Sequence, residues 1–134
     1  MNIILNAPAL PFSVLQWNTI LRSMLGIVDR SSAQINLYLE RDGRMAELNH
    51  DFMSYPGPTN VLSFLAGRTD YLGEICISYD ALRREAILYG QSLKEQAVFL
   101  LAHGLAHLLG YDHGQEMDNI CALMIKNVPE TELL

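Results

Sequence analysis

The sequence predicts a single α+β domain in which helices cover a small mixed β-sheet of about four strands. Two observations predict this class. Short apolar runs bounded by turn-forming residues are interspersed with longer runs whose apolar residues recur at helical spacing. Half of the 134 residues are apolar and the formal net charge is −6, a composition typical of folded globular proteins. Since the chain has no internal repeat and no low-complexity linker, we expect residues 1–134 to form one domain.

Four short runs have the length and composition of β-strands. They cover residues 2–7, 35–39, 59–65 and 73–78. Pro8 ends the first run because proline cannot donate to a strand ladder. In the last run, the alternation of side chains places Ile75 and Ile77 on one face of the sheet and Cys76 on the other.

Five longer runs have helical spacing. They cover residues 12–25, 45–52, 79–89, 93–109 and 116–127. Asp42 and Gly43 are expected to form a turn before the second helix. Ser78 and Ser92 are expected to cap the third and fourth helices, and Glu95 completes a capping box with Ser92. The fourth helix is apolar almost all round, so we expect it to be largely buried.

Cysteine usage and hydropathy limit the class of protein. Cys76 and Cys121 are far apart and form no Cys-x-x-Cys pair, which favours buried thiols in a reducing compartment. The longest apolar stretch, residues 97–111, contains two histidines and is shorter than the roughly 20 residues that a bilayer requires. We therefore expect no membrane span.

Three of the four histidines lie between residues 103 and 113. His103 and His107 are four residues apart, so on a helix they lie one turn apart on the same face. Gly110 can adopt the left-handed conformation that ends a helix, and the chain beyond it can bring His113 back to the same point. Three imidazoles with an open fourth position are the ligand set of a catalytic zinc, so the segment predicts one bound zinc ion.

The alternative interpretation is that these histidines are core residues with hydrogen-bond partners. Each imidazole nitrogen buried without a partner would cost about 1–3 kcal/mol, whereas one shared cation satisfies a nitrogen on every ring. The spacing follows the metzincin protease signature except that Gly104 replaces the glutamate, which is the general base in those proteases. We therefore expect the three histidines to keep the ligand geometry of these proteases, whereas the glutamate that acts as their general base is absent. The sequence does not identify another general base.

Three motifs in order resemble the YbeY family of bacterial rRNA-maturation endoribonucleases: residues 58–64, residues 72–78 and the histidine segment. The resemblance implies a zinc-dependent, single-strand-specific endoribonuclease that acts in maturation of the 3′ end of small-subunit ribosomal RNA and in ribosome quality control. It further implies metal ligation by His103, His107 and His113, a cytoplasmic location, and ribosomal RNA, the small subunit and ribosomal proteins as partners. Neither a membrane nor DNA is expected as a partner.

The sequence departs from the family pattern in the loop that follows the second predicted helix. The family has an arginine there, within a Tyr-Arg-Gly-Lys-Asp run, and Met53 occupies that position. The family aspartate before Val-Leu-Ser-Phe is Asn60. If the family arginine binds the scissile phosphate, this chain either uses another arginine, for which Arg44 and Arg68 in flanking segments are the candidates, or has weak nuclease activity.

Two polar residues near the histidines have open roles. Asp112 could accept a hydrogen bond from a ligand histidine and so orient its ring, or it could cap the turn after Gly110. Ser63 could line the catalytic cleft or face solvent. His50 is expected on the surface, and Met117 and Met124 are expected in the core.

Two other functions fit parts of the pattern. A metal-dependent peptidase or small-molecule hydrolase is favoured by the metzincin-like spacing and opposed by Gly104. A non-catalytic, ribosome-associated zinc protein is consistent with Met53 and with nine basic against fifteen acidic residues.

Overall fold

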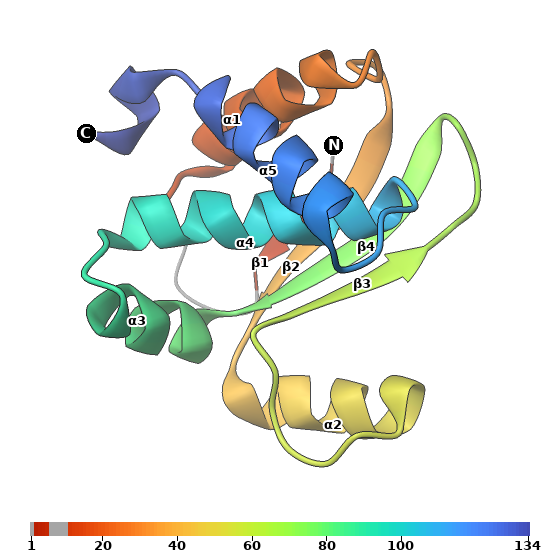
Figure 1. Ribbon diagram of the computed structural model, residues 1–134. Coiled ribbons are helices and arrows are strands. Elements are labelled where there is room, and N and C mark those ends of the chain that lie inside the picture. The colour runs from red at the N-terminus through yellow and green to blue at the C-terminus, as the bar shows by residue number, and fades with distance from the viewer. Residues whose placement is uncertain (1, 6–10) are drawn as a thin grey trace.

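The computed structural model describes residues 2–5 and 11–134 and has the α+β architecture expected from the sequence (Figure 1). Its elements are β1 (Asn2–Leu5), α1 (Val14–Ile27), β2 (Gln34–Glu40), α2 (Asp42–Met53), β3 (Val61–Leu65), β4 (Tyr71–Ser78), α3 (Tyr79–Leu88), α4 (Leu93–Leu108), α5 (Gln115–Lys126) and a short 3-10 helix, η1 (Glu130–Leu133). None of the helices in these ranges is both long and apolar enough to cross a bilayer.

The sheet is mixed, as predicted, and its strand order is β1-β2-β4-β3. β1 pairs with β2 in parallel and β2 pairs with β4 in parallel, whereas β3 runs antiparallel to β4. Parallel neighbours need crossover connections, which here contain α1 and α2. β3 is at one edge of the sheet, so its outer side is available to a neighbouring site.

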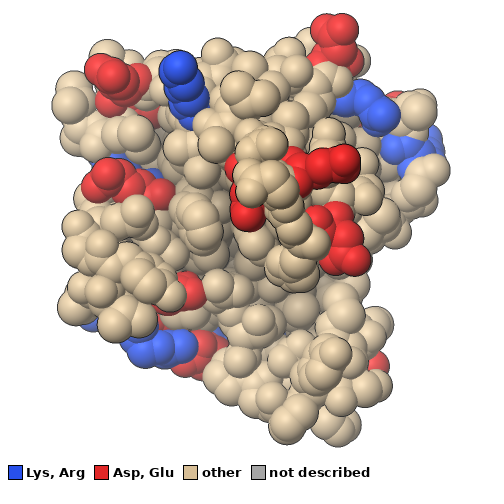
Figure 2. Space-filling view, in the orientation of Figure 1, with Lys and Arg blue, Asp and Glu red and all other residues tan. Residues whose placement is uncertain are grey.

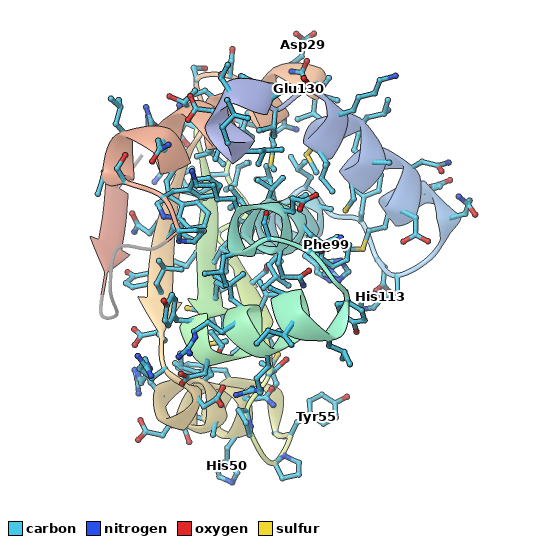
Figure 3. All side chains as sticks on the ribbon, turned by 90° about the vertical axis from the view of Figure 1, so that its left-hand side faces the viewer. Asp29, His50, Tyr55, Phe99, His113 and Glu130 are labelled. Carbon is cyan, nitrogen blue, oxygen red and sulfur yellow. The ribbon has the colours of Figure 1, made fainter. Side chains whose placement is uncertain are left out.

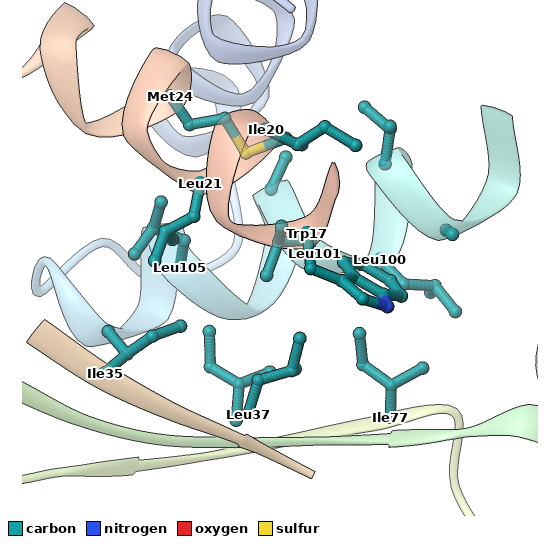
Figure 4. Packing of buried hydrophobic residues seen from close by; sticks show 14 of the residues in the cluster. Trp17, Ile20, Leu21, Met24, Ile35, Leu37, Ile77, Leu100, Leu101 and Leu105 are labelled. Carbon is teal, nitrogen blue, oxygen red and sulfur yellow. The ribbon is translucent and has the colours of Figure 1, made fainter. Parts of the chain in front are cut away.

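One face of the sheet packs against α1 and α4 to form the main core (Figure 4). The strands contribute Ile35, Leu37 and Ile77 to this core, and all three are fully buried. Trp17 of α1 and Leu101 of α4 lie above them and are also fully buried. Because complete burial of such side chains stabilises the fold by about 1.5–3 kcal/mol each, this layer fixes the position of α4.

A second, smaller cluster forms on the opposite face of the sheet. It contains Met45 and Leu48 of α2 together with Leu62 and Cys76 of the sheet. The expected division of β4, with Ile75 and Ile77 on one face and Cys76 on the other, is therefore confirmed.

α4 is the buried helix expected from its composition, and the Ser92 and Glu95 capping box at its start is present. Gly104 lets this helix lie close to the sheet. A Cβ atom at this position would lie 2.9 Å from Cγ2 of Ile75 and 3.1 Å from Cγ2 of Val61. The last two turns of α4, which carry two of the histidines, are thus held directly against β3 and β4.

One local prediction is wrong. Asp42 and Gly43 are the first residues of α2, not a turn, because the Asp80 carboxylate of α3 accepts a hydrogen bond of 2.9 Å from the Asp42 backbone N–H. The acidic end of the chain, for which the sequence predicts no element, contains η1. β1 ends at Leu5, and residues 6 and 7 of the predicted first strand lie outside the described residues.

Candidate metal centre

The three histidines of residues 103–113 converge at the C-terminal end of α4. His103 and His107 lie one turn apart on the helix. Gly110 has a φ of 96°, a value that side-chain-bearing residues rarely adopt, and the chain turns there before it enters α5. His113 lies in this connection. The ring centroids are 5.2 Å apart for His103 and His107, 5.4 Å for His103 and His113, and 5.0 Å for His107 and His113.

This arrangement fits a single metal ion. One nitrogen from each ring lies within 4.8 Å of the other two. Nitrogens that share a tetrahedral zinc are about 3.4 Å apart, given zinc–nitrogen distances of about 2.0–2.1 Å, so small rotations of the rings bring all three into bonding reach. The spacing predicted this convergence, and the structure brings the three residues together.

The environment of His103 favours the neutral imidazole. Burial lowers the pKa of His103 below its ordinary value, and the neighbouring rings of His107 and His113 lower it further, while Asp118 acts in the opposite direction. A metal binds only the neutral form of imidazole. The half-buried position of His103 therefore prepares it for ligation.

A backbone carbonyl orients the second histidine. Nδ1 of His107 lies 3.2 Å from the carbonyl oxygen of Tyr111. Since a carbonyl can only accept, Nδ1 carries the proton in this hydrogen bond, and Nε2 is left with its lone pair for a metal. The sequence did not predict this contact because any residue at position 111 could supply the carbonyl.

Asp112 holds the turn that carries the third histidine. Its Oδ1 accepts a hydrogen bond of 2.8 Å from the backbone N–H of His113. This contact corresponds to the turn-stabilising role rather than to a hydrogen bond with the imidazole. Phe99, one turn before His103, stacks on the ring of His103 with a centroid distance of 6.0 Å. Figure 3 shows Phe99 and His113 close together on the same side of the molecule.

A hollow of about 550 Å³ lies beside His107. It is lined by residues of α2, the following loop, β3 and the turn after α4, and we name it the β3 hollow. Ser63 lines it, and the Ser63 hydroxyl donates a hydrogen bond of 2.8 Å to the carbonyl oxygen of Gly104. Ser63 thus both borders the cleft and ties β3 to α4, and it does not simply face solvent.

The structure does not bring either candidate arginine into the β3 hollow. Arg44 pairs with Glu47 at 3.0 Å and lines a different pocket, one that also contains Cys76 on the opposite face of the sheet. Arg68 pairs with Asp70 at 2.7 Å. Met53 and Tyr55 line the hollow instead, and none of its described lining residues is Lys or Arg. Figure 2 likewise shows no Lys or Arg over the segment between α2 and β3 on the face displayed.

Gly104, which replaces the metzincin glutamate, faces the sheet and not the histidines. A Cβ atom there would also lie 3.3 Å from the Ser63 hydroxyl oxygen, so a glutamate does not fit without displacement of β3 or β4. This position therefore cannot supply a general base to the metal centre in the observed fold. The remaining expectations for this part of the chain are confirmed, because His50 is exposed and Met117 and Met124 are buried.

Comparisons with known proteins identify relatives over most of the chain. The family model described as "Endoribonuclease YbeY" matches residues 12–128. The chain is similar to the endoribonuclease YbeY of Lawsonia intracellularis, with 40% identity over 87% of this chain and 86% of the relative. It is also similar to that of Oleidesulfovibrio alaskensis, with 38% identity over 79% of this chain and 77% of the relative.

A solved structure supports the fold. The solution structure of a Thermotoga maritima protein superposes with a TM-score of 0.67 and covers 95% of this chain and 87% of that one. The sequence identity between the two is 23%, so this likeness concerns the fold alone.

Proposed function

The chain belongs to the YbeY family of endoribonucleases, and from this membership we propose that it is a zinc-dependent endoribonuclease specific for single-stranded RNA. Its proposed role is maturation of the 3′ end of small-subunit ribosomal RNA and ribosome quality control, carried out in the cytoplasm by residues 1–134 as one domain. The observation that carries the proposal is the convergence of His103, His107 and His113 beside the β3 hollow.

The three histidines would hold the zinc ion, which in such a site polarises a phosphodiester oxygen and makes water more acidic. The other residues position this centre. The Tyr111 carbonyl fixes the tautomer of His107, and Asp112 fixes the backbone of His113. The hydroxyl of Ser63 keeps β3 against the helix that carries His103 and His107.

The shape and charge of the β3 hollow support a single-stranded substrate. A hollow of about 550 Å³ can take an extended strand with splayed bases and is too small for a duplex. Tyr55 lines it and is 66% exposed, and an exposed aromatic side chain suits stacking on a base. Because no described lining residue is Lys or Arg, we propose that the RNA is presented largely by the small subunit and its ribosomal proteins rather than captured by charge.

The experiment that tests the proposal compares two histidine variants. His107→Ala should abolish both zinc content, measured by elemental analysis, and cleavage of single-stranded ribosomal RNA. His50→Ala is the matched control, since His50 is exposed on α2 and outside the metal centre, and it should keep both properties. Undiminished cleavage by metal-free His107→Ala would contradict a metal-dependent mechanism.

A second candidate is a non-catalytic, ribosome-associated zinc protein, which the lack of Lys and Arg among the described lining residues of the β3 hollow favours. Ribosome association with no turnover on any single-stranded RNA would select this candidate. A peptidase or small-molecule hydrolase is opposed by the packing around Gly104, and cleavage of casein without cleavage of RNA would be needed to restore it.

A further inference from the structure

The outer edge of β3 borders the β3 hollow. In the described sheet β3 is the last strand and pairs only with β4 (Figure 1). Residues from both faces of this strand line the hollow. Val61 and Ser63 lie against Gly104 of α4 on one face, whereas Leu62 packs with α2 on the other. The hollow therefore lies alongside the edge of the strand and not over a single face.

The pairing of β3 with β4 fixes which backbone groups point toward the hollow. The Ser78 N–H donates a hydrogen bond of 2.8 Å to the Asn60 carbonyl, and the Ala66 N–H donates one of 3.0 Å to the Leu72 carbonyl. In an antiparallel pair, residues that bond to the neighbouring strand alternate with residues that do not. The even-numbered residues of this stretch therefore bond to β4. The N–H and C=O groups of residues 61, 63 and 65 point away from β4, toward the outer edge.

The sequence of β3 leaves this edge unprotected. Proteins usually block a free strand edge with charged side chains, proline or a bulge, because its unpaired N–H and C=O groups attract other chains. β3 contains neither a charged residue nor a proline, and its register with β4 is continuous from Val61 to Leu65. Leu65, at its end, is 60% exposed. Such an edge suits a ligand with a matching row of donors and acceptors.

The backbone of an RNA strand carries groups that match the outer edge of β3. Alternate residues of a strand are about 6.8 Å apart, and the nucleotides of an extended RNA strand repeat at a similar distance. Each nucleotide contains phosphate oxygens, which accept from N–H groups, and a 2′-hydroxyl, which donates to C=O groups. Backbone N–H groups are common partners of phosphates in nucleic-acid complexes. They can serve here, where no described lining residue of the hollow is Lys or Arg.

We propose that the outer edge of β3 holds the RNA strand. The N–H groups of Val61, Ser63 and Leu65 donate to phosphate oxygens, and their carbonyl oxygens accept from 2′-hydroxyl groups. The bound strand then passes His107, which lines the same hollow. This inference rests on the proposed nuclease function, because it names the contacts by which that site binds its substrate.

The proposed contacts use backbone atoms, so they do not depend on the side chains of these residues. They also select RNA over DNA, because DNA has no 2′-hydroxyl. A polypeptide strand would match the same edge. The continuity of the edge with the metal centre and the exposed Tyr55 in the same lining favour RNA instead.

Nuclear magnetic resonance tests the proposal directly. A short single strand of adenosine nucleotides is added to the zinc-loaded full chain at low temperature, and its length is checked afterwards so that binding of the intact strand is measured. The amide signals of Val61, Ser63 and Leu65 should shift most. Those of Leu62 and Phe64, which bond to β4, should shift least. The DNA strand of the same sequence should bind about tenfold more weakly, because it lacks the 2′-hydroxyl donors.

Two substitutions at one position separate the backbone from the side chain. Leu65→Pro removes one outer N–H, and a proline whose nitrogen faces outward is tolerated at a sheet edge. It should weaken RNA binding about tenfold, because a hydrogen bond to a charged group is lost. Leu65→Val keeps the N–H and shortens the same side chain, so it should weaken binding by no more than about twofold. The shift pattern of the wild-type protein needs no substitution, so it tests the proposal even if Leu65→Pro does not fold.

Three results would each overturn the assignment. They are equal affinity for the RNA and DNA strands, equal shifts of the outer and inner amides, and a folded Leu65→Pro that binds as tightly as Leu65→Val. A polypeptide strand would then be the remaining occupant of the edge. Cleavage of single-stranded ribosomal RNA by the wild-type protein is measured in parallel. A protein that cleaves RNA without the alternating shifts overturns the β3 assignment alone, and one that shows these shifts without cleaving any RNA overturns the nuclease proposal alone.

Discussion

Ser63 shows how a residue beside a metal centre can act through packing. Its hydroxyl donates to the Gly104 carbonyl and therefore cannot at the same time offer that proton to a substrate. The same carbonyl lies within α4 and accepts from the helix as well, so loss of the hydroxyl leaves no orphaned group. We assign Ser63 a positioning role.

Ser63→Ala should accordingly lower the free energy of unfolding by about 1 kcal/mol and leave most of the nuclease activity intact. Urea denaturation and a single-stranded RNA cleavage assay measure the two effects. Ser23→Ala, which removes a hydroxyl bonded to Ile20 within its own helical turn, is the matched control and should cost less. A loss of activity by orders of magnitude in folded Ser63→Ala would show that this hydroxyl takes part in the chemistry.

The convergence of the three histidines could be predicted from the sequence because local rules fix it. Helical periodicity places His103 and His107 on one face, and only a glycine readily makes the turn at position 110. The stacking of Phe99 on His103 follows from the same rule, since the two residues lie four positions apart on α4. The hydrogen bond from Ser63 to the Gly104 carbonyl could not be recognised in this way, because it joins residues 41 positions apart in the chain.

The close contact between the helix α4 and the sheet depends on Gly104, because glycine has no side chain. A methyl group there would meet Cγ2 of Ile75 at 2.9 Å. Overpacking of this kind costs about 1–3 kcal/mol and moves the helix that carries two ligands.

Gly104→Ala should therefore destabilise the protein by about 1–3 kcal/mol and weaken zinc binding. Gly43→Ala is the matched control, since Gly43 also lies in a helix but a Cβ atom added to it would meet no neighbour within 4 Å. It should be neutral or stabilise the protein by up to about 1 kcal/mol. Urea denaturation and competition for zinc with a chelator measure the changes, and equal behaviour of the two variants would contradict the packing argument.

The start of α2 is stabilised by contacts with other elements. Local sequence does not show these contacts, so Asp42 and Gly43 were predicted to form a turn. Oδ2 of Asp42 accepts from Arg84 of α3 at 2.6 Å, and Oδ1 accepts from Ser78 at 2.9 Å. The hydrogen bond from Arg84 holds the pKa of Asp42 below its ordinary value of 3.8, with a further contribution from Ser78, while burial opposes them. No pattern within residues 40–45 reveals these partners.

This network predicts a pH dependence of stability. A carboxyl group with a lowered folded-state pKa stabilises the protein above its unfolded pKa, and the contribution disappears as the pH falls through the folded value. Wild-type stability should therefore drop as the pH falls below 3.8, while Asp42→Asn should lose about 1 kcal/mol at neutral pH and show less of this acid-dependent drop. Asp29→Asn, an exposed position, should follow the wild type. If the free energy of unfolding depended on pH in the same way for Asp42→Asn and the wild type, the role assigned to Asp42 would be refuted.

At the scale of the whole molecule, the fold class and the strands could be predicted from the spacing of apolar residues, because each strand and helix buries one consistent set of side chains. The placement of the β3 hollow beside the metal centre could not be predicted, since it depends on how α2 and the loop after it pack against β3. Two acidic side chains, Glu116 and Asp118, lie in the first turn of α5, shortly after the third histidine. A chain with net charge −6 and a hollow free of described Lys and Arg is suited to a substrate that is delivered already bound to a larger assembly.

The most direct test of the central claim is X-ray absorption spectroscopy at the zinc edge, combined with elemental analysis, on protein purified without a histidine tag. We predict one zinc ion per chain with three imidazole nitrogens at about 2.0–2.1 Å and a light atom in the fourth position. Absence of zinc, or a coordination shell with fewer than three imidazoles, would contradict a centre built from His103, His107 and His113.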